Sequence, residues 1–213
     1  MLVGERMSKP VISVPPDMPI VDALNLMKTH HISRTPVMDK DKLVGIVSDE
    51  DLKNASTSSV TSLSMWELNY LLSKIKVRDV MTKEVLTVTE STPIEATARM
   101  MADNRIGGMP VMRGDRVVGI ITETDLFKIF LELMGAREEG LRATILMTEK
   151  PGQLAALTKA ISDLGGNFIA FGQFAGDKPS NRLVTFKVKG VPEAQLIPIL
   201  SLLAEKVIDL RTC

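Results

Sequence analysis

An internal repeat constrains this chain more than any other feature of its sequence. When the sequence is aligned with itself without gaps, Met7 falls on Met81. The same offset pairs Val14 with Val88, Met27 with Met101, Pro36-Val37-Met38 with Pro110-Val111-Met112, Gly45-Ile46 with Gly119-Ile120, and Asp51-Leu52 with Asp125-Leu126. A gap-free match of this length indicates a duplicated unit, which we expect to fold in the same way twice.

Each copy has the pattern of a small α/β unit. An apolar strand is expected at 11–14, and Pro19 suits the first turn of a helix whose apolar residues recur at helical spacing. Two strands joined by a polar turn follow Pro36, and a helix is expected to start at Ser48. The second copy predicts the same elements at 85–88, after Pro93, after Pro110 and from Thr122. The order strand, helix, strand, strand, helix in both copies places the chain in the α/β (α+β) class.

The segment between the copies, 57–76, predicts a linker that contains a helix. Ser64 can cap this helix and Glu67 can reach back to the cap, so the helix would begin with a capping box and run to Ile75. Three residues share one face at helical spacing, namely Trp66, Tyr70 and Leu71. Packing of this face against the rest of the molecule is favoured over a partner-binding role.

The turn that closes each copy carries the chemistry. Ser48 in the first copy and Thr122 in the second follow an apolar strand, at the expected first residue of a helix. The free N–H groups and the dipole of a helix N-terminus form an anion site, to which the hydroxyl adds a donor. Three residues later, Asp51 or Asp125 lies on the same face and can accept hydrogen bonds from the vicinal hydroxyls of a ribose. A plain helix cap is the alternative for one copy alone, but the recurrence of hydroxyl and carboxylate in both copies favours a nucleotide site.

These features resemble a pair of CBS domains over residues 1–133. The resemblance rests on the Gly-x-x-[Ser/Thr]-x-x-Asp ending of each copy, the strands after Pro36 and Pro110, and the opening Arg78-Asp79-Val80-Met81-Thr82 of the second copy. It implies one compact module that often dimerises and binds AMP, ADP, ATP or S-adenosylmethionine in clefts between the repeats. By this resemblance, Ser48 and Thr122 would meet phosphate or ribose, Asp51 and Asp125 would hold ribose hydroxyls, and the adenine would lie near Ile12, Leu86, Thr35 and Met109.

The C-terminal part of the chain does not continue the repeat. Its apolar pattern predicts strands at 141–147, 168–174, 182–188 and 207–210, with helices at 154–164 and 192–206. The resulting order βαββαβ is that of a ferredoxin-like domain.

This part resembles an ACT domain, a family whose members associate side by side and commonly bind amino acids. The resemblance rests on the turn Pro151-Gly152-x-Leu154 and on the segment Gly166-Asn167-Phe168-Ile169. It makes Glu149, Pro151, Gly152 and Asn167 the candidates for a ligand site. Glu149 stands where the family usually has Asp, so a purely structural role for the turn remains the alternative.

Together the patterns predict a first CBS repeat at 1–56, a linker at 57–76, a second CBS repeat at 77–133 and an ACT domain at 140–213. This arrangement resembles the AcuB-type proteins grouped under acetoin utilisation. The resemblance implies a homodimeric, non-catalytic regulator that senses an adenine nucleotide and acts on a metabolic enzyme. An assembly scaffold without ligand and an enzyme with an unrecognised carboxylate site are the alternatives.

Composition narrows the classes of function further. The chain has 26 basic and 26 acidic residues without a Lys/Arg cluster, which argues against nucleic-acid binding. The single cysteine, Cys213, allows no intramolecular disulfide and fits a reducing cytoplasm. The sequence lacks a signal-peptide pattern and an apolar run of about 20 residues, so we expect neither secretion nor a membrane span. The two histidines, His30 and His31, point to different faces of a helix and predict no metal site, and no nucleophile motif or Walker loop predicts an enzyme.

Overall fold

The computed structural model describes residues 1–57 and 74–213. The chain divides into two compact units, Met1–Leu126 and Phe127–Cys213. The capping box of Ser64 and Glu67 and the face of Trp66, Tyr70 and Leu71 lie outside the described residues. Within the described ranges, no helix is both long and apolar enough to cross a membrane.

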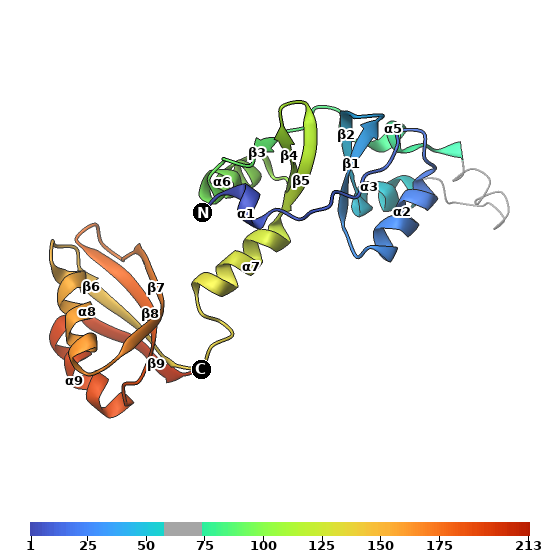
Figure 1. Cartoon of the computed structure of the whole chain (residues 1–213). Coiled ribbons are helices and arrows are strands. Elements are labelled where there is room, and N and C mark those ends of the chain that lie inside the picture. The colour runs from blue at the N-terminus through green and yellow to red at the C-terminus, as the bar shows by residue number, and fades with distance from the viewer. Residues whose placement is uncertain (58–73) are drawn as a thin grey trace. The chain divides into compact units, whose positions relative to one another are not determined.

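The first unit holds the two copies of the repeat, and its elements follow the predicted order (Figure 1). The first copy forms α1 (Val3–Arg6), α2 (Ile20–Thr29), β1 (Arg34–Asp39), β2 (Lys42–Ser48) and α3 (Asp49–Thr57). The second copy forms α5 (Val77–Val80), β3 (Val88–Thr89), α6 (Ile94–Asn104), β4 (Gly108–Arg113), β5 (Arg116–Thr122) and α7 (Glu123–Leu133), of which only the residues up to Leu126 belong to the first unit. In both copies the hairpin strands pair antiparallel with a register shift at the same place, between Val37 and Met38 and between Val111 and Met112.

The strand expected at the start of each copy is shorter than the sequence predicted. In the first copy only Val14 pairs, in an isolated parallel bridge to Val37. In the second copy the strand β3 has two residues, which pair with β4. Pro15 and Pro16, which have no N–H groups to donate to a strand ladder, end the pairing after Val14.

The helices after the hairpins begin one residue later than predicted. Ser48 and Thr122 are the last residues of β2 and β5, and the helices α3 and α7 start at Asp49 and Glu123. The two hydroxyl residues therefore stand at the junction of strand and helix, which is the N-cap position.

The opening segment of each copy packs on the other copy. The backbone N–H groups of Val3 and Gly4 donate to the carbonyls of Thr92 and Glu90 in the second copy. The segment that opens the second copy does the converse, since Val77 N–H donates to the carbonyl of Met18. In Figure 1, α1 accordingly lies beside α6 and β3, and α5 lies beside β2.

This exchange is also present in the hydrophobic core. The core cluster of the first copy contains Ile20 and Met27 of α2, Val37 and Val47 of the hairpin, and Val77 from the opening of the second copy, all nearly inaccessible to solvent. Each half of the module is therefore completed by about one helical turn of the other.

The second unit has the predicted order βαββαβ. Its elements are β6 (Leu141–Thr148), α8 (Gln153–Asp163), β7 (Asn167–Ala175), β8 (Asn181–Lys189), α9 (Glu193–Leu203) and β9 (Lys206–Thr212). They form an antiparallel sheet with the strand order β7-β8-β6-β9. Alternate residues of the central strands, such as Ile145 and Phe186, form one core with Leu157 and Ile161 of α8 and Leu200 of α9, which is the alternation expected of strands with one face under helices.

Candidate ligand cleft between the repeats

The junction between β2 and α3 forms a capping box around Asp51. The carboxylate oxygen Oδ2 of Asp51 accepts hydrogen bonds from the backbone N–H of Ser48 at 2.8 Å and from its hydroxyl at 2.6 Å. The backbone N–H of Asp51 lies 3.2 Å from the Ser48 hydroxyl oxygen. The helix-cap role foreseen as an alternative is therefore present. The two hydrogen bonds of the cap engage Oδ2 of Asp51, and Oδ1 has no hydrogen bond to any described residue.

The second copy repeats the two hydrogen bonds to the carboxylate and adds a contact from the opening segment. Asp125 Oδ2 accepts hydrogen bonds from the backbone N–H of Thr122 at 2.9 Å and from its hydroxyl at 2.8 Å. The other carboxylate oxygen, Oδ1, accepts a hydrogen bond from the hydroxyl of Ser8 at 3.2 Å. Asp125 is 6% exposed.

A cleft of about 360 Å³ opens at the capping box of the first copy. Its walls come from both repeats. The first copy supplies Arg34, Ile46, Val47, Ser48, Glu50 and Asp51, and the second supplies Thr82, Glu84, Val85, Leu86, Asn104, Arg105, Ile106 and Gly108. The volume is in the range of small-molecule sites, and the lining combines an apolar wall with a few polar groups.

Arg34 brings a positive charge across the boundary between the repeats. A Cβ atom built on Gly107 would lie 2.7 Å from Nη1 of Arg34, and one built on Gly108 would lie 3.5 Å from the same atom. The guanidinium therefore lies against a stretch of backbone that has no side chains, and a larger residue at Gly107 would displace it. A guanidinium in a cleft offers paired donors to a phosphate or a carboxylate.

The structure brings together three of the residues predicted from the sequence. Ser48, Asp51 and Leu86 line the cleft, although they come from different repeats. Thr35 and Met109 are fully buried, and the hydroxyl of Thr35 donates to the carbonyl oxygen of Ile12 at 2.5 Å. Neither Thr35, Met109 nor Ile12 is among the residues that line this cleft, and Thr122 and Asp125 belong to the junction of the other copy.

The charged residues of the cleft walls were not predicted from the sequence. Arg34, Glu50, Glu84 and Arg105 carry no local pattern that distinguishes them from other surface residues. A comparison of the copies could have singled out the two arginines, because the repeat does not preserve them: the same offset places Gly108 opposite Arg34 and His31 opposite Arg105.

Three of the candidate ligand residues of the second unit, Glu149, Pro151 and Gly152, lie around the first turn of α8. Asn167 lies at the opposite end of the sheet, because it pairs with Lys189 whereas Thr148 pairs with Asn181. Glu149 follows β6, and its carboxylate forms an ion pair with Arg182 of β8. Pro151 and Gly152 form the turn, and Gly152 has a φ of 86°, which favours glycine. Asn167 is the first residue of β7 and is exposed.

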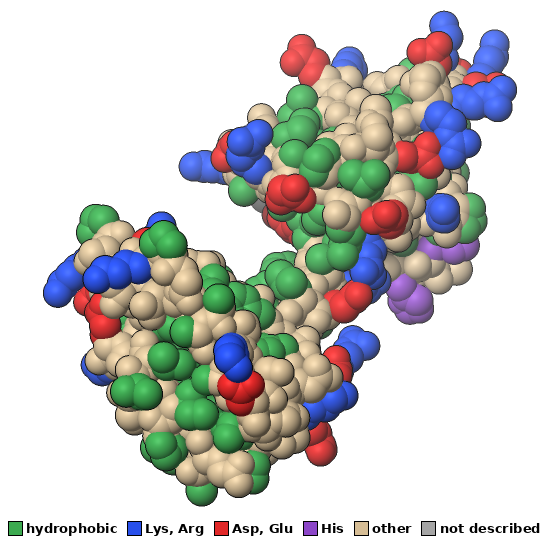
Figure 2. All heavy atoms as spheres, turned by 60° about the vertical axis from the view of Figure 1, so that its left-hand side comes forward, with side chains coloured by type: hydrophobic (Ala, Val, Ile, Leu, Met, Phe, Trp, Pro, Cys, Tyr) green, Lys and Arg blue, Asp and Glu red, His purple; other side chains and the backbone are tan. Residues whose placement is uncertain are grey.

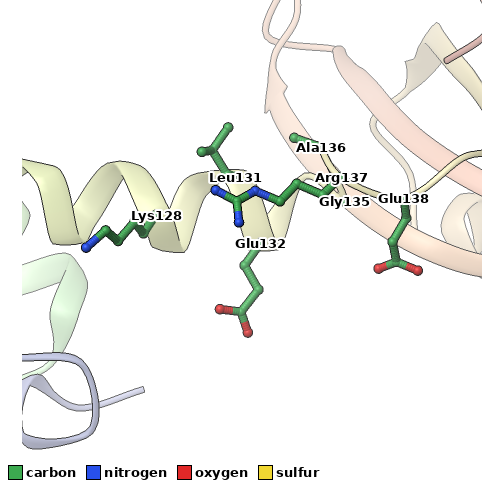
Figure 3. Close-up of a pocket in the computed structure, with 7 residues that line it drawn as sticks. All are labelled: Lys128, Leu131, Glu132, Gly135, Ala136, Arg137 and Glu138. Carbon is green, nitrogen blue, oxygen red and sulfur yellow. The ribbon is translucent and has the colours of Figure 1, made fainter.

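The second unit has a hollow that is lined by the end of α7 and the residues that follow it (Figure 3). Its lining is Lys128, Leu131, Glu132, Gly135, Ala136, Arg137 and Glu138. Their polar groups point in different directions in Figure 3 and do not converge on a common point. This hollow therefore lacks the arrangement of a ligand site.

Two ion pairs outside the cleft shift the pKa values of their carboxylates. Hydrogen bonds from Arg113 lower the pKa of Glu90, and those from Arg211 lower the pKa of Asp209, but none of these residues lines the cleft. On the face shown in Figure 2, basic and acidic side chains are interspersed. Within residues 1–57 and 74–213, no three His, Cys, Asp or Glu side chains gather in a way that could hold a metal ion.

A curated relative is similar to the repeat part of this chain. The inosine-5'-monophosphate dehydrogenase of Methanocaldococcus jannaschii is 36% identical over 126 residues, which are 58% of this chain and 22% of the dehydrogenase. The chain thus spans about a fifth of the length of that enzyme.

Solved structures with this fold include complexes with adenine-containing ligands. The CBS domain pair of protein MJ0100, in complex with 5'-methylthioadenosine and S-adenosyl-L-methionine, matches 65% of this chain and 98% of its own length, at a TM-score of 0.52 and 29% identity. CBSX2 in complex with AMP matches 61% of this chain and 96% of its own length, at a TM-score of 0.50 and 31% identity. A putative acetoin utilization protein (AcuB) from Vibrio cholerae matches 64% of this chain and 95% of its own length, at a TM-score of 0.54 and 28% identity.

The family comparison agrees with the duplication. The model of the CBS domain matches residues 3–58 and again residues 77–132, together more than half of the chain. The chain therefore belongs to the CBS-domain family and carries two copies of the domain.

Proposed function

We propose that this protein is a non-catalytic regulator that senses an adenine nucleotide or S-adenosylmethionine in the cleft at Asp51. The observation that carries this proposal is the state of the Asp51 carboxylate. One of its oxygens is held by the cap, while the other is left without a partner among the described residues at the wall of a cleft. A ribose hydroxyl is a donor that such an oxygen can accept.

The other walls supply what the rest of such a ligand needs. The N-terminus of α3 and the guanidinium of Arg34 favour an anionic group, either a phosphate or the carboxylate of S-adenosylmethionine. Val85, Leu86 and Ile106 offer apolar surface to a base.

The relatives support the ligand class. The complexes of MJ0100 with 5'-methylthioadenosine and S-adenosyl-L-methionine and of CBSX2 with AMP share an adenine-containing ligand. Both structures are about 30% identical to this chain and cover the repeats.

A regulatory role fits the chain better than catalysis. The dehydrogenase relative is an enzyme, but this chain matches only 22% of its length. We propose that ligand binding shifts a homodimer between two states that bind it with different affinity, and that a metabolic enzyme in the cytoplasm reads the change. The likeness to the Vibrio cholerae protein supports a link to acetoin utilisation.

We also propose that the residues from 140 to 213 form an ACT domain after CBS repeats at 1–56 and 77–133 and a linker at 57–76. The order βαββαβ and the left-handed glycine at the start of α8 support this assignment. An amino acid bound at Glu149, Pro151 and Gly152 would have to compete with Arg182 for the carboxylate of Glu149. Asn167 lies at the other end of the sheet and does not join this site within one chain.

The experiment that tests the main proposal is calorimetric titration of the full chain with AMP, ADP, ATP and S-adenosylmethionine. We expect saturable binding of at least one of them, and weakening by about ten- to hundredfold in Asp51→Asn, because a hydrogen bond to a charged group is lost. Asparagine keeps one oxygen for the cap, so the helix start is preserved.

Asp49→Asn is the matched control on the same helix. Asp49 forms an ion pair with Lys53, at 2.6 Å between Oδ2 and Nζ, and does not line the cleft. Its variant should bind as the native chain does. If none of the four compounds binds, the proposal is wrong and the scaffold without ligand becomes the better explanation. Turnover of any of them would favour an enzyme.

A further inference from the structure

The charged residues that line the Asp51 cleft are of both signs, and the negative ones are in excess. Arg34 and Arg105 contribute two positive charges, whereas Glu50, Asp51 and Glu84 contribute three negative ones. Apart from the capping contacts of Asp51, none of these side chains forms a hydrogen bond or an ion pair with a described residue. Their charges are therefore available to a ligand, and the lining as a whole attracts a cation more than an anion.

Two of the three carboxylates have no function in the fold. Asp51 holds the start of α3, and the repeat preserves it. Neither Glu50 nor Glu84 accepts a hydrogen bond from a described residue. The repeat preserves neither of them, since their equivalents in the other copies are Thr124 and Pro10. These two carboxylates therefore belong to this cleft alone.

The two signs of charge come from different segments of the cleft walls. Glu50 and Asp51 stand together in the first turn of α3. The guanidinium of Arg34 lies at Gly107, and Arg105 precedes this glycine by two residues. The helix N-terminus and the guanidinium groups favour an anionic group, but the carboxylates beside them oppose a multiply charged one such as a phosphate.

S-adenosylmethionine has the charges that this lining complements. Its sulfonium and ammonium groups are positive, and its single carboxylate is a partner for a guanidinium. AMP, ADP and ATP carry only negative charge, on phosphates that the carboxylates of the lining repel. A site can discriminate between ligands by such repulsion of one as well as by attraction of the other.

We propose that Glu50 and Glu84 are specificity determinants of the cleft, which select the cationic S-adenosylmethionine over AMP, ADP and ATP. The inference rests on the proposed function, because it decides between ligands that the proposed function leaves open. Both side chains are exposed, so solvent and salt screen their charges and each contributes a modest factor.

The test is calorimetric titration of the full chain with S-adenosylmethionine, S-adenosylhomocysteine and AMP. The first two compounds share the adenosine and the amino-acid group, but S-adenosylhomocysteine lacks the methyl group and with it the sulfonium charge. We expect S-adenosylmethionine to bind about tenfold more tightly than S-adenosylhomocysteine, and more tightly than AMP. Added salt should weaken the binding of S-adenosylmethionine but not that of AMP, because it screens an attraction in the first case and a repulsion in the second.

Variants that remove one charge each separate the two residues from the rest of the cleft. In Glu50→Gln and in Glu84→Gln, the affinity for S-adenosylmethionine should fall by about two- to fivefold, as for the loss of an exposed ion pair, and the affinity for AMP should rise. A merely structural role would change both affinities in the same direction. Glu95→Gln is the matched control, because Glu95 is exposed on α6 and does not line the cleft, and it should change neither affinity.

Three results would each overturn the inference and leave the proposed function standing. They are tighter binding of AMP than of S-adenosylmethionine, equal binding of S-adenosylmethionine and S-adenosylhomocysteine, and variants at Glu50 and Glu84 that shift the affinities for S-adenosylmethionine and AMP alike. If neither S-adenosylmethionine nor AMP, ADP or ATP binds to the native chain, the proposed function is wrong, and the inference falls with it.

Discussion

At the scale of single residues, Lys187 is the buried charge that most needs an explanation. It is 5% exposed on β8, and its Nζ donates to the carbonyls of Gly135 at 3.1 Å and Glu138 at 2.8 Å. A buried ammonium requires such partners, because desolvation without them is costly. Lys187 therefore holds the residues that follow α7 on the sheet of the second unit.

Replacing Lys187 with Met should lower the free energy of unfolding of the second unit by about 1–3 kcal/mol, because buried carbonyl groups lose a charged donor. Amide hydrogen exchange in β6 and a denaturant titration would measure the loss. Lys189→Met, two residues along the same strand at an exposed position, should have little effect. Equal effects of the two variants would show that the hydrogen bonds of Lys187 add nothing to stability.

At the scale of elements, each hairpin has a glycine where the opening segment of the other copy crosses it. A Cβ atom built on Gly45 of β2 would lie 2.5 Å from Sδ of Met81, and one on Gly119 of β5 would overlap Sδ of Met7. The repeat preserves the glycine and the methionine in both copies. A strand without a side chain at this position permits the close approach of another segment.

We predict that Gly119→Ala destabilises the first unit by about 1–3 kcal/mol, the usual effect of an added methyl group in a packed site. The same substitution in a Met7→Ala background should cost less, because the smaller side chain leaves room for the new methyl group. A double-mutant cycle on denaturant unfolding measures the difference. Additive effects would mean that the two residues do not share this space.

At the scale of the whole molecule, the two copies complete each other. The short helix α1 contacts β3 and β5 of the second copy, and α5 contacts β2 and α3 of the first. Val3 and Val77, at equivalent places, are both fully buried. Neither copy has a complete core alone, so we expect the pair to unfold as one cooperative module.

Val3→Ala should lower the free energy of unfolding of the first unit by about 1–3 kcal/mol, because methyl groups are lost and a cavity is left behind. The resulting increase in amide exchange should be largest in β4 and β5 rather than in the neighbouring part of the sequence. Val77→Ala is the mirror control, and it should affect β1 and β2 most. An increase that stays within the copy carrying the substitution would contradict the exchange of opening segments.

The sequence by itself determined the features that depend on local pattern. The gap-free offset between Met7 and Met81 established the duplication, and apolar periodicity predicted the order of elements in both units. The residues of the capping boxes could be named because the hydroxyl and the carboxylate stand three residues apart.

Only the tertiary structure decided which segments and side chains meet. The opening segments pack on the opposite copies, Arg34 reaches the loop at Gly107, and Ser8 donates to Asp125 from 117 residues away. Such contacts depend on how the two copies pack, and helical or strand periodicity carries no information about that packing. The repeat therefore predicts two equal sites, while the structure makes them different, because the side chains that cross between the copies are not the same.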